Sequence, residues 1–212
     1  MRAPSWVPLS FRFVLALVAA MALSPFKQAL ADEATDRAQA VVSDLASDIW
    51  ANIGKAKAEG RRRRLADAIK AKTNVDILSR LSLGKNWRRL NPEQQNEYQR
   101  LFSIVIMDAL AGRLDLLLGE LSGPLDQHFK VVDSMRVGKR DVLVRSKVIA
   151  LADAPLSVDW RLRESDEGPF IIDLVIEGIS LLVSQRAEFA AVIGREQADG
   201  LIQALRRRVP RS

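Results

Sequence analysis

Residues 169–189, PFIIDLVIEGISLLVSQRAEF, decide the fold class of this chain. The first part of the stretch has an apolar side chain at every second position: Phe170, Ile172, Leu174 and Ile176. This is the period of one face of a β-strand. Glu177-Gly178 breaks the pattern, and from Ile179 onward the apolar residues approach helical spacing. The stretch therefore predicts a strand that leads directly into an amphipathic helix.

Three more strands are predicted upstream, at residues 128–135, 141–151 and 156–163. The turns between the four strands are short and contain Gly138, Asp153 with Pro155, and Gly168 with Pro169. Connections this short force neighbouring strands to be antiparallel, so the four strands form a meander. Along the second and third strands, apolar residues alternate with charged ones. One face of the sheet is therefore apolar and needs a cover.

Helices predicted in the first half of the chain can supply that cover. They span residues 34–53, a short segment opened by Arg61–Arg64, residues 75–83, and a long helix from about 91 to 117. Asn91-Pro92 followed by Gln94 is a strong start signal for the long helix, with Asn at the N-cap and Pro at the first helical position. The expected fold is α+β, a four-stranded antiparallel meander sheet covered on one face by helices.

The first 31 residues have the features of an export signal. Arg2 and Arg12 are basic, residues 13–23 are uninterruptedly apolar, and Ala29-Leu30-Ala31 is a cleavage motif. The apolar run is shorter than a membrane span, so we expect cleavage rather than anchoring. Removal of residues 1–31 lowers the net charge of +6 by three. Residues 32–212 are expected to form a single domain.

Composition argues against most enzyme classes. The chain has no Cys and one His, His128, and it lacks a glycine-rich phosphate loop. Asp173 and Glu177 are the best remaining acidic pair, and we expect them to satisfy backbone or cationic groups where the strand becomes a helix. We therefore expect no catalytic residue, metal or cofactor, although fold alone does not exclude a pocket enzyme. The arginine run has no interleaved aromatic residues, which argues against nucleic-acid binding.

Four sequence elements, in order, resemble the MlaC or toluene-tolerance family. They are Leu83-Gly84 with Trp87; Asn91, Pro92, Gln94, Tyr98 and Phe102; Asp173, Glu177, Gly178, Ser180, Gln185 and Phe189; and Asp199-Gly200-Leu201 to Leu205. The resemblance implies a fold like that of the nuclear-transport-factor superfamily, with an apolar pocket between sheet and helices. It also implies a periplasmic lipid carrier that moves phospholipid between an outer-membrane lipoprotein complex and an inner-membrane ABC transporter complex, with a related branch associated with hopanoids.

If the chain has the pocket that this resemblance implies, the apolar residues of the sheet and the long helix are candidate lipid contacts. They are Leu101, Phe102, Val105, Leu110, Val142, Val144, Val148, Val158, Trp160, Leu162, Ile172, Leu174 and Ile176. For each of them, ordinary core packing is the competing interpretation. Arg61, Arg62, Arg63 and Arg64 are a candidate docking patch for an anionic headgroup or an acidic partner, or else a solvated face. The alternative functions are a non-catalytic accessory protein, for example hopanoid-associated, or a pocket enzyme; we expect a monomer.

Overall fold

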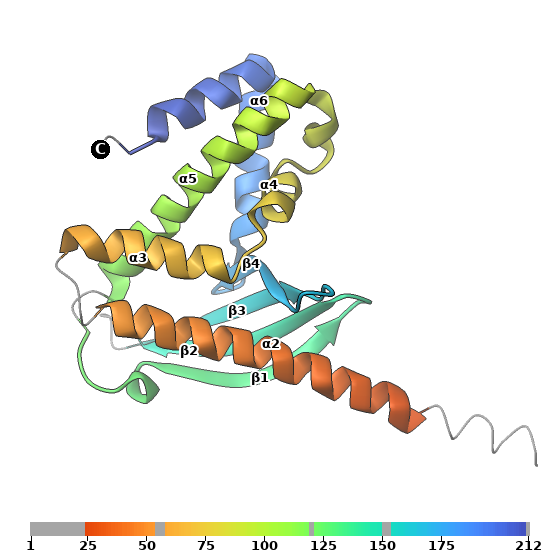
Figure 1. Ribbon diagram of the computed structural model, residues 1–212, viewed down its shortest axis with the longest axis vertical. Helices are drawn as coiled ribbons and strands as arrows, with labels where there is room; N and C mark the ends of the chain where they lie inside the picture. Colours follow the sequence, from red (N-terminus) through yellow and green to blue (C-terminus); the bar gives the residue numbers. More distant parts are fainter. Residues whose placement is uncertain (1–23, 54–57, 119–120, 150–153, 211–212) are drawn as a thin grey trace, which may run out of the picture.

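The computed structural model describes residues 24–53, 58–118, 121–149 and 154–210 (Figure 1). The expected export signal lies largely outside these ranges, as do the last two residues of the strand expected at 141–151. The helices are α2 (Ser24–Ile53), α3 (Ala58–Ala71), α4 (Val75–Leu83), α5 (Pro92–Leu118) and α6 (Leu181–Arg208), with short 3-10 helices η1 (Gly84–Arg89) and η2 (Leu125–Gln127). The strands are β1 (Phe129–Val137), β2 (Asp141–Ile149), β3 (Pro155–Arg163), β4 (Phe170–Ile176) and β5 (Ile179–Ser180).

The sheet is an antiparallel meander in the order β1-β2-β3-β4-β5. This confirms the expected α+β class, but the expected number of strands is wrong, because the described sheet has five rather than four. Glu177 and Gly178 both have positive φ, 48° and 79°, as the two central residues of a tight hairpin turn can have. The turn brings Ile179 opposite Ile176 and creates β5. The helix consequently begins at Leu181, with Ser180 as its N-cap.

The strict alternation expected along β4 is also corrected. The pairing of β3 with β4 shifts between Arg161 and Leu162, because Asp173 lies opposite Arg161 and Ile171 lies opposite Leu162. One extra residue, Ile172, is accommodated at this irregularity. Ile171, which the two-residue period placed on the other face, therefore lies with the apolar side chains of the sheet.

Two apolar clusters organise the described part of the chain. The sheet cluster joins one face of the sheet to α2, α3 and the C-terminal part of α5: Ala34, Ala38, Val42, Leu45, Ile49, Leu65, Ala111, Leu118, Val142, Val144, Val158, Trp160, Leu162 and Ile171. The helical cluster joins α4, η1, α5 and α6: Leu83, Leu90, Tyr98, Leu101, Phe102, Val105, Phe189, Ile193, Ala198, Leu201, Ile202 and Leu205. In Figure 1, α2 lies along the sheet, whereas α4, α5 and α6 group together beyond α3. Helix α5 takes part in both clusters.

Candidate functional site: the apolar face of the sheet and its helical cover

The apolar face of the sheet and the helices that cover it form a continuous apolar cluster. Val142, Val144 and Leu162 are completely buried beneath the helices. Around them lies a margin of partly buried apolar side chains from strands and helices. This margin comprises Val41, Trp50, Ala66, Ala68, Leu114, Leu121, Phe129, Val131, Val148, Leu156 and Leu174. Apolar contacts are not directional, so other apolar groups could replace some of them at small cost.

One polar side chain on this face was not anticipated from sequence. Ser146 is buried between Val144 and Val148, and its Oγ donates to the carbonyl oxygen of Val158 at 2.8 Å. The indole Nε1–H of Trp160 donates to the same Oγ at 2.9 Å. Both buried donors are therefore satisfied within the sheet, and neither is left unpaired beneath the apolar cover.

The structure brings together most of the sheet residues expected to contact lipid. Val142, Val144, Val158, Trp160 and Leu162 belong to the sheet cluster, and Val148 and Leu174 pack against it. Ile176 is partly buried opposite Val158, and Ile172 is buried at the register irregularity. Their contact with a ligand stays a prediction.

The four residues expected on the long helix are placed differently. Leu101, Phe102 and Val105 belong to the helical cluster, and Leu110 is partly buried on α5. The part of α5 that covers the sheet lies further along the chain, at Ala111, Leu114 and Leu118. The three-to-four-residue spacing continues through both stretches of α5, so periodicity alone could not separate them.

The helical cluster is held by directional contacts as well as apolar ones. Tyr98 is completely buried, its hydroxyl lies 2.6 Å from Ser82 Oγ, and burial raises its pKa well above the ordinary value. The Phe189 ring packs edge-on against the rings of Tyr98 and Phe102, with centroids 5.9 and 6.4 Å apart. These contacts fix the geometry of the cluster more tightly than apolar packing alone.

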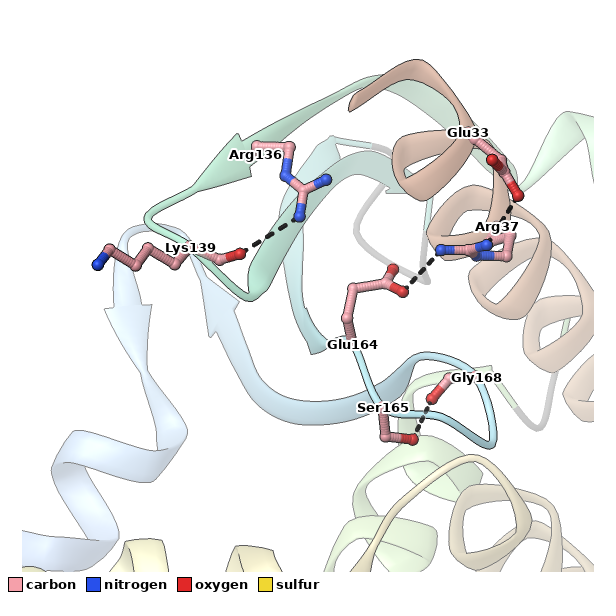
Figure 2. Close-up of polar contacts among 7 residues, drawn as sticks. All are labelled: Glu33, Arg37, Arg136, Lys139, Glu164, Ser165 and Gly168. Atoms are coloured by element: carbon pink, nitrogen blue, oxygen red, sulfur yellow. Dashed lines mark hydrogen bonds and ion pairs between the residues drawn. The ribbon is translucent and has the colours of Figure 1, made fainter. Parts of the chain in front are cut away.

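Polar contacts hold α2 in place at its middle and near its C-terminal end. Figure 2 shows Arg37 between Glu33 and Glu164, to which its guanidinium donates at 2.9 and 3.0 Å. The other carboxylate oxygen of Glu164, Oε1, is buried without a hydrogen-bond partner in the described structure. Towards the C-terminal end of α2, the Trp50 indole donates to the Gly123 carbonyl oxygen at 3.2 Å and stacks on His128.

The expected docking patch is divided by the fold. Arg61 forms an ion pair with Asp115, and Arg62 forms one with Asp108 at 2.5 Å. Both acids lie on α5, so these two arginines link α3 to α5. Arg63 and Arg64 are exposed. Consecutive arginines on a helix point in different directions, and a run in the sequence therefore does not make one surface.

Asp173 and Glu177 have the structural partners that the sequence led us to expect. Asp173 accepts hydrogen bonds from Ser180 Oγ at 2.5 Å and from the backbone N–H of Leu182 at 2.9 Å. Glu177 accepts one from the backbone N–H of Ser157. Asp173 thus stabilises the start of α6, and Glu177 ties the turn after β4 to β3. Within the described ranges, no group of three or more potential metal-binding side chains comes together.

Among the described residues, no helix has the length and apolar character required to cross a membrane. The fold is similar to that of a phospholipid-binding protein from Ralstonia solanacearum, whose solved structure is in complex with a phospholipid. The TM-score is 0.65 at 24% sequence identity, over 82% of this chain and 96% of the other, a likeness that establishes the fold. A search of curated proteins gave no significant match. The model of the MlaC protein family matches residues 37–207, and the chain belongs to that family.

Proposed function

We propose that this protein is a periplasmic lipid carrier that holds phospholipid acyl chains between the sheet and its helical cover. In this proposal, residues 32–212 form the exported lipid-binding domain, and the carrier shuttles lipid between an outer-membrane lipoprotein complex and an inner-membrane ABC transporter complex. Membership of the MlaC family supports a binding protein rather than an enzyme. The similarly folded Ralstonia protein, which binds a phospholipid, supports the same class of ligand.

The observation that carries the proposal is the difference between the two apolar clusters. In the sheet cluster, the sheet packs against α3 and the end of α5 mainly through apolar side chains. A margin of partly buried apolar residues surrounds these contacts. The helical cluster is crossed by hydrogen bonds such as that between Tyr98 and Ser82. Acyl chains can replace apolar contacts without leaving polar groups unpaired, so the sheet cluster is where a lipid can enter.

The anchors of α3 indicate which end of the cover opens. The chain just after α3 is tied to the sheet, because the backbone N–H of Ile171 donates to the carbonyl oxygen of Lys72 at 2.9 Å. The N-terminal half of α3 is tied instead to α5, through Arg61–Asp115 and Arg62–Asp108. We propose that this half of α3 and the C-terminal part of α5 move together away from the sheet to admit the tails.

The energetics require such a protein environment. Two acyl chains of roughly 16 carbons gain on the order of 25 kcal/mol when they leave water, so a bilayer lipid cannot cross an aqueous gap unaided. An apolar protein interior offers the tails much the same environment as the bilayer. The free energy of moving the tails between bilayer and protein is then close to zero, so the carrier can both take up and release its lipid.

The experiment that tests the proposal is native mass spectrometry, with lipid extraction, of the protein purified from the periplasm of its own organism. We expect a mature chain that begins at Asp32 and carries one phospholipid per protein. A bound hopanoid instead of a phospholipid would identify a different lipid as the cargo and would leave the carrier proposal in place. A protein that stays free of lipid after incubation with phospholipid vesicles would overturn the carrier proposal and favour a non-catalytic accessory role.

A further inference from the structure

A pocket lies on the helical part of the molecule, away from the sheet cluster. Its volume is about 370 Å³, at the lower end of the range of ligand pockets. It is formed where α4, η1 and α6 meet, and it is open to solvent. The lining residues are Ile77, Arg80, Leu81, Gly84, Trp87, Arg88 and Arg186.

One wall of this pocket is held in place by a close contact between α6 and α4. The Arg186 guanidinium donates from Nε and Nη2 to the carbonyl oxygen of Leu81, at 3.0 and 2.7 Å. Its side chain crosses Gly84, where a Cβ atom would lie only 3.2 Å from Arg186 Cδ and Nε. Gly84 also has φ of 54°. The glycine thus permits both the turn and the approach of the arginine.

The opposite wall combines an aromatic ring with positive charge. The Arg80 guanidinium lies over the Trp87 ring, with its Cζ 5.2 Å from the centroid, a cation–π contact. Arg88 is exposed on the same rim. None of the lining residues is acidic. By contrast, arginines elsewhere in the described structure form ion pairs with carboxylates, as at Asp108, Asp115 and Asp141.

We infer that this pocket is a docking site for an acidic segment of a partner protein, which places one apolar side chain against Trp87 between flanking carboxylates. Arg80, Arg88 and Arg186 would pair with those carboxylates. The apolar lining residues Ile77 and Leu81 would contact the partner's apolar side chain. Trp and Arg are the residue types most enriched at the energetic centres of protein interfaces. The pre-formed walls reduce the ordering cost of binding.

The shape favours a protein segment over a lipid surface. A bilayer presents a broad, flat array of headgroups, whereas this site is one local pocket of about 370 Å³ with its arginines grouped around an aromatic ring. Two of the three arginines also have their orientation fixed, by Leu81 and by Trp87, which suits a particular geometry rather than a diffuse field. The inference builds on the proposed carrier function, because a carrier must be recognised by the proteins that load or unload it.

The test is photo-crosslinking of the full chain in cells of its own organism. A benzoyl-phenylalanine residue replaces Lys85, which is exposed beside Gly84, or, as a control, Lys139, which is exposed in the turn between β1 and β2. We expect position 85, but not position 139, to give a protein adduct, and its crosslinked peptide to carry Asp or Glu beside an apolar residue. Arg88→Glu should lower the adduct yield at position 85 about tenfold, the change expected for loss of an interface anchor. Arg140→Glu, in the exposed turn between β1 and β2, should leave the yield unchanged.

Four outcomes would overturn the inference: no protein adduct at position 85, adducts with lipid only, a contact peptide without acidic residues, or a yield insensitive to Arg88→Glu. Bound lipid is measured on each variant, and thermal unfolding verifies that each one folds. Loss of the adduct with bound lipid retained locates the defect in docking. A lipid-free protein that still gives the acidic adduct would refute the carrier proposal and leave this inference standing.

Discussion

At the scale of single residues, Ser146 lets a tryptophan lie in an apolar sheet face. Trp160 is large and buried, and its indole N–H needs an acceptor once water is excluded. The Ser146 hydroxyl accepts that hydrogen bond and donates its own proton to a neighbouring carbonyl oxygen. The pair keeps the ring in a fixed orientation, with its apolar surface available to the cover.

Ser146→Ala is therefore expected to destabilise the protein by about 1–3 kcal/mol, because it leaves the buried Trp160 N–H without an acceptor. Urea unfolding followed by circular dichroism measures the change. Ser47→Ala is the matched control, since the Ser47 hydroxyl bonds only to a carbonyl oxygen on its own exposed helical turn, and it should stay within about 0.5 kcal/mol of wild type. Equal midpoints for the two variants would contradict this role for Ser146.

At the scale of elements, α6 is two helical pieces joined at a strained residue. Gln197 has φ of 60° and ψ of −172°, a conformation that glycine adopts far more readily than glutamine. At this kink the chain folds back so tightly that a Cβ on Gly200 would overlap the Cβ of Glu196. Gly194, three residues before the kink, has open space around it.

These two glycines should respond in opposite ways to the same substitution. Gly194→Ala should raise the free energy of unfolding by about 0.5–1 kcal/mol, because alanine is the better helix former. Gly200→Ala should lower it by about 1–3 kcal/mol, since the added methyl has no space. Thermal unfolding of both variants measures the difference, and stabilisation by Gly200→Ala would show that the kink is absent in solution.

A carboxylate clamp joins α5 to the C-terminal piece of α6. Glu97 accepts hydrogen bonds from Arg100 and Arg206, which lower its pKa from 4.5 to about 2. A lowered pKa contributes stability that is fully present above the ordinary value and is lost as pH falls towards the folded value.

Wild-type stability should therefore decrease between about pH 5 and pH 2 more steeply than that of Glu97→Gln, which has no charge to lose at this position. Urea midpoints measured across that range test the prediction. Parallel pH profiles for the two proteins would mean that the clamp is not formed in solution.

Some of the helices and strands could be predicted from the sequence, and others could not. Period-two alternation predicted β2, β3 and β4 within a few residues, and the Asn91-Pro92 signal located the start of α5, because these features depend on local side-chain preference. Strand β5 and the irregularity at Ile172 were missed, because they depend on a tight turn and on pairing with β3. The kink was not predicted at Gln197, since glutamine favours neither turn nor break, and the nearby signal, Asp199-Gly200, lies two to three residues further along the chain.

For the whole molecule, the important division is between the two apolar clusters, and the sequence could not show it. An apolar stripe along α5 looks continuous, but its first part faces α4 and α6 and its last part faces the sheet. Only tertiary contacts assign Leu101, Phe102 and Val105 to one cluster and Ala111 and Leu118 to the other. The arginine run was likewise divided, by acids on α5 that lie far away in the sequence.

This division predicts that a larger side chain on α5 lowers the amount of bound lipid where the helix faces the sheet cluster. The same change where the helix faces the helical cluster should have no effect. Leu114 and Ile106 are both partly buried on α5, eight residues apart, but Leu114 packs against the sheet cluster and Ile106 against the helical cluster. Leu114→Trp should fill space that acyl chains require and strongly reduce co-purified lipid, whereas Ile106→Trp should retain the wild-type lipid stoichiometry. Lipid extraction and quantification after matched purification measure both, with circular dichroism confirming that each variant folds. If Ile106→Trp loses lipid and Leu114→Trp keeps it, the tails lie in the helical cluster, and Leu101, Phe102 and Val105 become their walls.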